Sequence, residues 1–221
     1  MSETFAVNEV FESIQGEARH AGTPSVFVRL QGCAVGCPWC DTKHTWAVDP
    51  AQEVGLEQML AKEADAATFA RMSQAHLLSV VGRFNARHVV ITGGEPCSYD
   101  LRSLTENLTR VGRSVQIETS GTQPVRVAPE TWVTVSPKLG MPGGFAVLEE
   151  ALARANEIKL PIGKMADVDR LTALIAGRIT TDEIWLQPLS RSQKATELCL
   201  SQAIERNWRL SVQVHQFRGV R

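Results

Sequence analysis

Residues 25–42 read SVFVRLQGCAVGCPWCDT, an apolar run followed at once by three closely spaced cysteines. The first six residues predict a β-strand, because β-branched and aromatic side chains recur in them. Cys33, Cys37 and Cys40 then follow with the spacing C-x3-C-x2-C. Neighbouring glycines relax the backbone there, so the loop can curl its three thiolates toward one metal centre.

Two kinds of metal centre fit this cysteine triplet. Three cysteines on a cubane of four irons leave one iron open to a small molecule, which a four-cysteine electron-transfer site does not. The triplet resembles that of the radical S-adenosylmethionine superfamily, which implies a [4Fe–4S] cluster that binds and cleaves S-adenosylmethionine. The alternative is a structural zinc site with His44 as the fourth ligand, in a binding protein without catalysis.

The rest of the chain alternates short β-rich runs with helical patterns. After the strand at 25–30, the further predicted strands are 88–92, 114–118, 132–135, 157–160, 183–187 and 209–214. Apolar residues at helical spacing lie between them at 101–111, 168–175 and 195–203, with Asp100 as the predicted N-cap of the first helix. This alternation predicts an α/β fold with a parallel sheet and crossover helices. We expect one domain over residues 1–221, a partial, open (β/α) barrel of about six parallel strands, with a helical insertion at about 49–72.

The composition excludes several classes of protein. The 221 residues carry a formal net charge of −1, so no global basic field points to nucleic acid or to an anionic membrane. The N-terminus lacks the basic start and apolar run of a signal peptide, and no stretch of about 18 apolar residues occurs. We expect a cytoplasmic protein, in which closely spaced cysteines are metal ligands or redox groups rather than disulfides.

Polar and glycine-rich sequence follows several predicted strands. In parallel α/β folds, ligands collect at the carboxyl ends of the strands. The relevant stretches are Thr92-Gly93-Gly94-Glu95, Glu118-Thr119-Ser120-Gly121 and Ser136-Pro137-Lys138. Two glycines allow the backbone to approach a ligand closely, and Glu95 could accept from an ammonium. Lys138 could pair a carboxylate. Together these ends predict a ring of donors and acceptors suited to a zwitterionic nucleoside.

Five separated motifs in order carry a closer resemblance. They are FESIQGE at 11–17, the cysteine loop continued as CPWCDTKHTW, HVVITGGEPC, QIETSGT and WVTVSPK. Over nearly its whole length the chain resembles the 7-carboxy-7-deazaguanine synthase family. The resemblance implies conversion of 6-carboxy-5,6,7,8-tetrahydropterin to 7-carboxy-7-deazaguanine, by radical-mediated ring contraction with loss of ammonia, in queuosine and 7-deazapurine biosynthesis. It also implies Mg2+ as a third cofactor and S-adenosylmethionine that is regenerated.

The resemblance further implies which residues bind the ligands. The substrate-binding residues are Ile14, Gln15, Gly16, Arg29 and Thr92. The contacts to S-adenosylmethionine are Trp39, Cys40, Asp41, Gly94, Ser136, Pro137 and Lys138. Cys33, Cys37 and Cys40 hold the cluster, and Thr42 is the Mg2+ ligand. An arginine suits a substrate carboxylate, although Arg29 could equally form a structural ion pair. A single hydroxyl suits Mg2+ when substrate and water complete the octahedron.

Two departures from the family pattern stand out. The family usually has glycine where Ala18 stands, and a position that needs a positive φ would tolerate alanine poorly. The C-terminus, 214–221, also differs, and His215 there is a structural contact rather than a ligand. The resemblance implies a homodimer and a flavodoxin-like electron donor. The nearest rival is a glycyl-radical activating enzyme, which shares the cysteine spacing and acts on a protein backbone.

Overall fold

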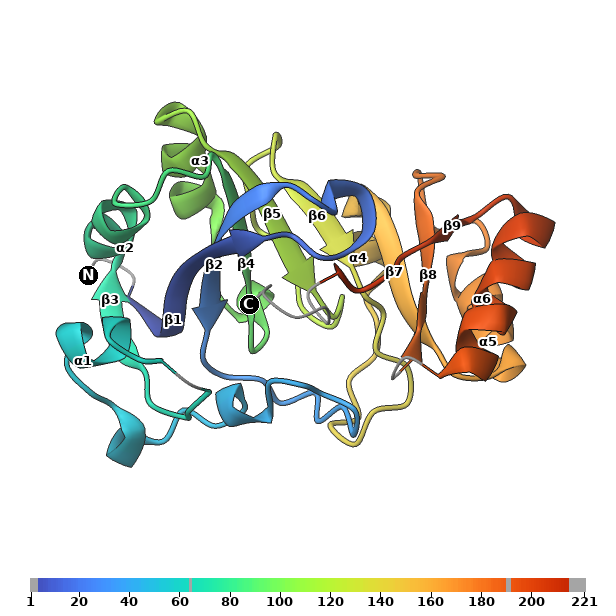
Figure 1. The fold of residues 1–221 in the computed structure, drawn as a ribbon, viewed down its shortest axis with the longest axis horizontal. Helices are drawn as coiled ribbons and strands as arrows, with labels where there is room; N and C mark the ends of the chain where they lie inside the picture. The colour runs from blue at the N-terminus through green and yellow to red at the C-terminus, as the bar shows by residue number, and fades with distance from the viewer. Residues whose placement is uncertain (1–3, 64, 190–191, 215–221) are drawn as a thin grey trace.

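A computed structural model describes residues 4–63, 65–189 and 192–214. Their strands form one nine-stranded sheet, in the order β3-β1-β2-β4-β5-β6-β7-β8-β9 (Figure 1). The strands are β1 Thr4–Ile14, β2 Pro24–Leu30, β3 Ala70–Ser73, β4 His88–Gly93, β5 Ser114–Thr119, β6 Trp132–Val135, β7 Glu157–Ile162, β8 Ile184–Pro188 and β9 Arg209–Leu210. From β2 to β9 all neighbours are parallel, and β1 and β3 add an antiparallel edge. The predicted α/β fold with a parallel sheet is confirmed.

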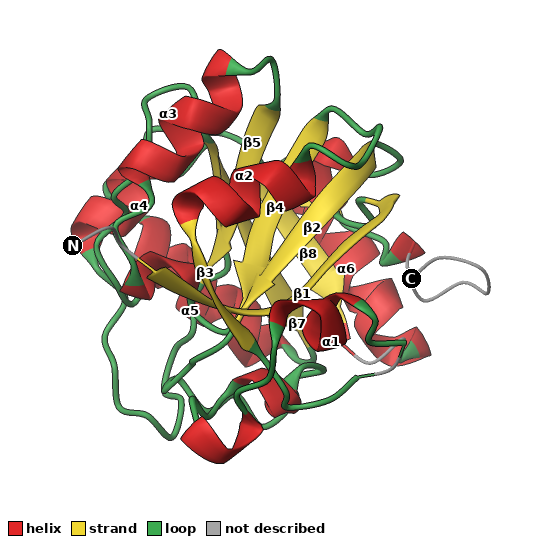
Figure 2. Ribbon diagram, turned by 90° about the vertical axis from the view of Figure 1, so that its left-hand side faces the viewer, coloured by secondary structure: helices red, strands yellow, loops and turns green. Residues whose placement is uncertain are grey.

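Helices connect the parallel strands and cover one face of the sheet (Figure 2). They are α1 Leu56–Leu60, α2 Gln74–Val81, α3 Arg102–Arg110, α4 Glu149–Arg154, α5 Met165–Ile175 and α6 Gln193–Arg206. Short 3-10 turns are η1 Ala18–His20, η2 Lys43–Thr45, η3 Pro50–Gln52 and η4 Pro96–Ser98. Within the described part of the chain, no helix combines the length and apolar character needed to cross a membrane.

Most differences from the predicted elements lie at one edge of the sheet. All seven predicted strands are present, with β9 shorter than its predicted run of 209–214. The strands β1 and β3 were not predicted. Residues 49–72, the predicted helical insertion, contain η3, the five-residue α1 and the start of β3. Helix α3 begins one residue later than expected, so Leu101 is its N-cap, while Asp100 accepts a hydrogen bond from the Arg102 amide at 3.0 Å.

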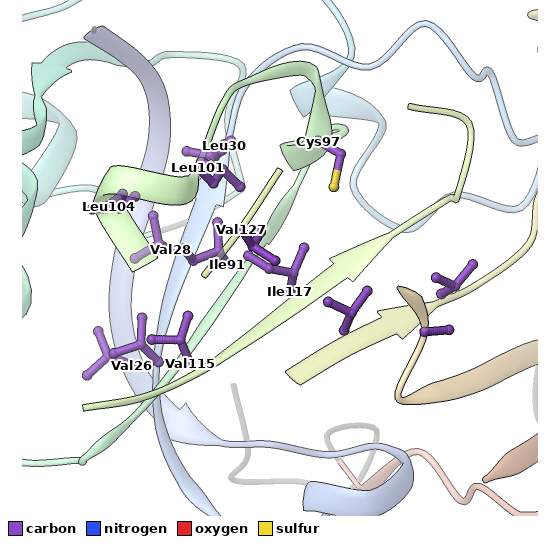
Figure 3. Close-up of a cluster of buried hydrophobic side chains, with 14 of the residues drawn as sticks. Val26, Val28, Leu30, Ile91, Cys97, Leu101, Leu104, Val115, Ile117 and Val127 are labelled. Carbon is purple, nitrogen blue, oxygen red and sulfur yellow. The ribbon is translucent and has the colours of Figure 1, made fainter. Parts of the chain in front are cut away.

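The helix-covered face of the sheet, called the outer face below, is aliphatic. In β2 it presents Val26, Val28 and Leu30, and these pack with Ile91 of β4 and with Leu104 of α3 (Figure 3). All five side chains are at most 1% exposed. This cluster anchors the strands whose ends carry the site.

The opposite, inner face takes the alternate residues of the same strands and is polar. The side chains of Ser25, His88, Gln116, Thr134 and Glu157 are buried there. The last four satisfy one another: Gln116 contacts the His88 ring at 3.0 Å and donates to Thr134 at 2.9 Å, and Thr134 donates to Glu157 at 2.7 Å. Buried polar groups paired in this way avoid the cost of lost hydration.

The segment after β1 lies against the inner face and joins strands that are far apart in the sheet. Gln15 donates to Gln116 of β5 at 3.2 Å, and the His20 ring packs on His88 of β4 with centroids 4.6 Å apart. Glu17 accepts from Gln187 of β8 at 3.2 Å. The sheet therefore curves around this segment.

Candidate active site

A cavity of about 510 Å³ lies between the inner face, the segment after β1 and the cysteine loop. Of the residues that the family resemblance assigns to ligands, all except Pro137 line this cavity. They are Ile14, Gln15, Gly16, Arg29, Cys33, Cys37, Trp39, Cys40, Asp41, Thr42, Thr92, Gly94, Ser136 and Lys138. Pro137 is buried between two of them in the chain. Glu118, Thr119 and Ser120 of the QIETSGT motif line the cavity too, so the fold brings residues from all five motifs to one place.

The cysteine loop is fixed to the body of the protein by a buried glutamine at its start. Gln31 is 1% exposed, and its side-chain amide donates to the carbonyls of His44 at 3.0 Å and Ala47 at 2.6 Å. Its Oε1 accepts from Asn8 of β1 at 2.8 Å. The loop and the segment after β6 run along the same end of the sheet (Figure 1), and the Gly143 amide donates to Val35 O at 3.1 Å.

The three cysteines of this loop suit an iron–sulfur cluster. All three line the cavity, and the Cys40 amide donates to Cys37 O at 3.0 Å, which closes a turn between two of the ligands. Burial raises the pKa of the Cys33 and Cys37 thiols, and the neighbouring cysteines raise it further. Three thiolates in this position would repel one another, so a cationic metal group is needed to hold them in the charged form.

His44 does not join the three cysteines as a fourth ligand. Its side chain does not line the cavity, and its buried Nε2 has no hydrogen-bond partner among the described residues. No three His, Cys, Asp or Glu side chains in the described ranges form a group suited to a single metal ion. The position of His44 therefore does not support the zinc alternative.

The loop's aromatic and hydroxyl residues surround Cys40. Trp46 donates from its ring nitrogen to the Cys40 sulfur at 3.4 Å, and the Thr42 hydroxyl lies 3.6 Å from the same sulfur. Trp39 is 44% exposed at the mouth of the cavity, and Asp41 beside it is exposed as well. Hydrogen bonds to a ligand sulfur are one means by which a protein tunes an iron–sulfur cluster.

The glycine pair after β4 packs against the start of the cysteine loop. A Cβ on Gly94 would lie 2.1 Å from Gly32 O, and one on Gly93 would lie 2.3 Å from the Leu30 amide nitrogen. Gly93 also has φ +105°, a conformation that favours glycine. The pair therefore allows backbone-to-backbone contact between β4 and the loop, in addition to the close approach to a ligand that its sequence suggests.

Glu95 lines the cavity and is hydrogen-bonded to neighbouring residues. Its carboxylate accepts from the Thr119 hydroxyl at 2.6 Å, from the Ser120 amide at 2.9 Å and from the Cys97 amide at 3.0 Å, and the Ser120 hydroxyl also donates to it. The residue is 3% exposed. It ties the end of β4 to the end of β5, and the expectation that it accepts from a ligand ammonium stays a prediction.

Arg29 forms an ion pair within the protein, which was one of the two roles considered for it from the sequence. It also lines the cavity, as the other role requires. Its Nε lies 2.6 Å from Glu9 Oε1, and its guanidinium lies 5.7 Å from the Phe11 ring centroid. The pair fixes the side chain through one edge of the guanidinium. In the described part of the chain no hydrogen bond from the two Nη groups is found, and these could bind a carboxylate.

Lys138 and Gln15 are likewise held by neighbours within the cavity wall. The Lys138 ammonium donates to Ser136 O at 3.0 Å and to the Ser136 hydroxyl. Burial lowers the pKa of Lys138, against the nearby Cys37. The Gln15 side chain donates to Gln116 and accepts from the Glu17 amide at 3.2 Å. These contacts set the orientation of both side chains before any ligand binds.

Sequence reasoning missed a charge cluster in the same cavity. Lys159 of β7 lies between Glu17 and Glu118, and Gln187 and Gln213 donate to Glu17 at 3.2 Å and 2.8 Å. All five residues line the cavity. Burial opposes the charge of Lys159, but Glu118 and Glu17 outweigh it and raise the pKa of Lys159. The available signal was Glu118 and Lys159 at alternate, inward positions of two predicted strands.

The chain is similar to known proteins over its whole length. No family model matches it. It is 52% identical over 221 residues to the 7-carboxy-7-deazaguanine synthase of Escherichia coli strain K12, covering 98% of this chain and 99% of that one. The protein of that name from Buchnera aphidicola subsp. Schizaphis graminum is 38% identical over 222 residues, with 98% and 99% covered. The crystal structure of QueE from Escherichia coli has a TM-score of 0.92 and 52% identity, covering 96% of this chain and 95% of that one.

Proposed function

The chain belongs to the 7-carboxy-7-deazaguanine synthase family, and we propose that it converts 6-carboxy-5,6,7,8-tetrahydropterin to 7-carboxy-7-deazaguanine. The pterin ring contracts by radical chemistry and ammonia is released, so the enzyme is a radical S-adenosylmethionine lyase of queuosine and 7-deazapurine biosynthesis. One observation carries this proposal: a single cavity unites the cysteine triplet with Arg29 and the segment Ile14–Gly16.

Cys33, Cys37 and Cys40 would hold the [4Fe–4S] cluster, and its open iron would take S-adenosylmethionine. When bound, the two together supply a carbon-centred radical that abstracts hydrogen from C6 of the substrate. Gly94, Ser136 and Lys138 line the same cavity as the cysteines, with Pro137 between the last two in the chain, and backbone groups there and the Lys138 ammonium can receive a methionyl carboxylate. Trp39 and Asp41 would contact the same ligand from the loop.

The substrate would occupy the part of the cavity near β1, β2 and β4. Arg29 would bind its carboxylate through the Nη groups, because Glu9 already fixes the Nε edge. Thr92 pairs with Arg29 across β2 and β4, so its hydroxyl lies beside that carboxylate. The exposed backbone of Ile14 and Gly16 suits the donor–acceptor edge of a pterin, and Gln15 holds this segment in place.

Thr42 would supply a hydroxyl to Mg2+, with the substrate carboxylate and water completing the octahedron. The hydroxyl lines the cavity two residues from Cys40, so an ion there could lie next to both the cluster and the substrate. Such an ion would stabilise negative charge as the ring rearranges.

Several finer features belong to the same proposal. The curved parallel sheet is the partial, open barrel of the radical S-adenosylmethionine type, and residues 1–221 form one domain. The enzyme acts in the cytoplasm as a homodimer and receives electrons from a flavodoxin-like protein. The full-length similarity to named synthases argues against a glycyl-radical activating enzyme, which acts on a protein backbone and needs no dedicated pterin contacts.

The test is an anaerobic reaction of reconstituted protein with reductant, S-adenosylmethionine, Mg2+ and 6-carboxytetrahydropterin, followed by mass spectrometry. We expect a product whose mass shows loss of ammonia, and no product from Cys33→Ala, Cys37→Ala or Cys40→Ala. If an intact cluster yields only 5′-deoxyadenosine and methionine, the radical assignment stands and the substrate is wrong. Arg29→Ala should abolish synthase turnover, whereas a glycyl-radical activating enzyme would tolerate it.

A further inference from the structure

The charge cluster of Glu17, Glu118 and Lys159 borders the cavity, and the ligand assignments above do not use it. Lys159 Nζ lies 2.8 Å from Glu118 Oε2 and 2.5 Å from Glu17 Oε2. The exposed fractions of the side chains are 6% for Lys159, 15% for Glu118 and 16% for Glu17. Two carboxylates around one ammonium carry a net negative charge. Burying such a charge is costly, so its presence indicates a chemical use.

Glu118 is the member of this cluster that lies between the two proposed ligand sites. Ile91 of β4 pairs with Ile117 of β5, so the next residues, Thr92 and Glu118, are neighbours on the inner face. On its other side Glu118 pairs with Thr134 of β6, two residues before Ser136. The carboxylate thus lies between the proposed substrate contact and the proposed S-adenosylmethionine contact, and all three residues line the cavity.

The surroundings of Glu118 suit a group that accepts a proton near neutral pH. Its two oxygens are held separately, since Gln116 donates to Oε1 at 3.0 Å and Lys159 donates to Oε2. Burial raises the pKa of Glu118 to about 7, with Lys159 opposing the rise and Glu17 and Glu157 adding to it. Lys138, at the end of β6, is a further charge that acts on Glu118. A base works best when its pKa is near the working pH.

Two of the other carboxylates at the cavity are tied more closely to the fold, and the third, Asp41, is exposed. Glu95 accepts from Thr119, Ser120 and Cys97. Glu17 accepts from Lys159, Gln187 and Gln213 together. Glu118 is the carboxylate whose pKa and position both fit proton transfer.

We propose that Glu118 is the base that removes the carbon-bound proton when ammonia leaves, and that Lys159 positions it. The inference rests on the proposed function. A C–H bond of the rearranged substrate breaks, its proton passes to Glu118, and its electron pair forms the new ring C=C bond. The C–N bond to the departing ammonium group breaks with its electron pair on nitrogen, and ammonia leaves. Glu118 then gives its proton to the ammonia, which departs as the ammonium ion, and the carboxylate is restored.

The test compares Glu118→Gln with Glu157→Gln in reconstituted holoenzyme. Glu157 is a matched control, because it lies on β7 two residues before Lys159, is fully buried on the same face and does not line the cavity. The radical step is followed by transfer of deuterium from C6 of labelled substrate into S-adenosylmethionine. Elimination is followed by ammonia and product formation, and substrate affinity by equilibrium dialysis.

We expect Glu118→Gln to keep deuterium transfer and substrate affinity while product formation falls by about 100-fold or more. The wild-type rate should fall as the pH is lowered through about 7, and the variant should lack this dependence. Glu118→Asp should recover part of the rate. Glu157→Gln should keep the wild-type rate near neutral pH, with the fall in rate moved to lower pH because Glu157 adds to the raised pKa of Glu118.

Two results in the Glu118→Gln protein would overturn the inference and leave the synthase assignment intact. The first is product formation at the wild-type rate with the wild-type pH profile. The second is a parallel loss of deuterium transfer and affinity, which would make Glu118 a binding group. If instead wild type and Glu157→Gln both form no product from an intact cluster, the proposed function fails and the inference falls with it.

Discussion

The outer and inner faces of the parallel sheet are made from alternate residues of the same strands, yet the outer face is aliphatic and the inner face carries the buried polar and charged side chains. β2 turns Val26 and Val28 outward and Phe27 and Arg29 inward. Strands covered on both faces in parallel sheets usually read as continuous apolar runs. Here the alternation persists through β7, where Ile158 packs outward and Lys159 faces the cavity. The outer face forms the aliphatic core, and the inner face carries the side chains that line the cavity.

The inner face is stable only because its polar groups satisfy one another. Gln116 at its centre contacts His88, Gln15, Glu118 and Thr134, which come from four different segments. Leaving one such group unpaired costs about 1–3 kcal/mol, and more where the group is charged. The outer face needs no such matching, since its side chains gain by burial alone. The two faces should therefore respond differently to substitution.

The largest loss of stability should follow removal of the Lys159 ammonium from the inner face. Lys159→Met leaves Glu17 and Glu118 facing each other without a cation, and breaking a buried pair in this way costs about 3–5 kcal/mol. Urea unfolding of the purified protein measures it. The triple variant Lys159→Met, Glu17→Gln, Glu118→Gln removes all three charges and should be more stable than Lys159→Met. Equal stability of the single and triple variants would contradict an electrostatic origin.

A substitution in the aliphatic outer face should cause a similar loss of stability without lowering the catalytic rate. Leu104 is 1% exposed and packs on the cluster of β2, β4 and β5 (Figure 3). Leu104→Ala should lower the free energy of unfolding by about 2–5 kcal/mol, as lost burial and a cavity add together. Product formation per folded enzyme should stay at the wild-type level at low temperature. A specific drop in kcat would show that the two faces are not separable.

The alternating sequence made the parallel part of this fold predictable. Runs such as HVVIT and WVTV are short, rich in β-branched residues and spaced by helical patterns, so local sequence carries the information. β1 was missed because its buried residues include Asn8 and Glu9, which gain their partners, Gln31 and Arg29, only in the folded chain. Such long-range pairing leaves no periodic signal.

The site divides in the same way. The cysteine loop and the strand-end motifs are local, and their residues meet in the cavity as the family resemblance implies. The cluster of Lys159 with Glu17 and Glu118 joins segments that are 142 and 41 residues apart, so no motif contains it. The predicted structural contact of His215 lies outside the described residues. Ala18 has a φ of +52°, so alanine stands at a position of positive φ, the conformation that alanine tolerates poorly.

The histidines at the amino-terminal end of the inner face should make stability depend on pH. Burial lowers the pKa of His20 to about 4, and the neighbouring His88 and Arg19 add to this. The neutral form is favoured in the folded state, so stability is complete above the unfolded pKa of about 6.5 and is lost as the pH falls toward 4.

His20→Phe keeps a ring against His88 and Trp132 and removes this titration. Between pH 7 and 4.5 the wild type should lose on the order of 2 kcal/mol more stability than the variant, allowing for partial exposure of the ring. The difference between the two curves removes the opposite contribution of Glu118, whose raised pKa favours the folded state at low pH. Parallel curves would show that His20 titrates normally.

The smallest expected change in stability concerns Ala18, in the turn after β1. It compares the cost of this residue's left-handed backbone conformation with the contacts that its methyl group makes. Ala18 adopts φ +52°, and its amide donates to the buried Ser211 hydroxyl at 3.0 Å. A left-handed conformation costs an L-residue about 1–2 kcal/mol, whereas glycine avoids that cost but adds entropy to the unfolded chain. Ala18→Gly should therefore raise stability by about 0.5–1 kcal/mol.

Asn207 is the matched control, because it ends α6 on the outer side with φ +54°. Asparagine tolerates this left-handed region, so Asn207→Gly should change stability little. Loss of stability in Ala18→Gly would mean that the alanine methyl packs in the inner face and that its contacts outweigh the strain.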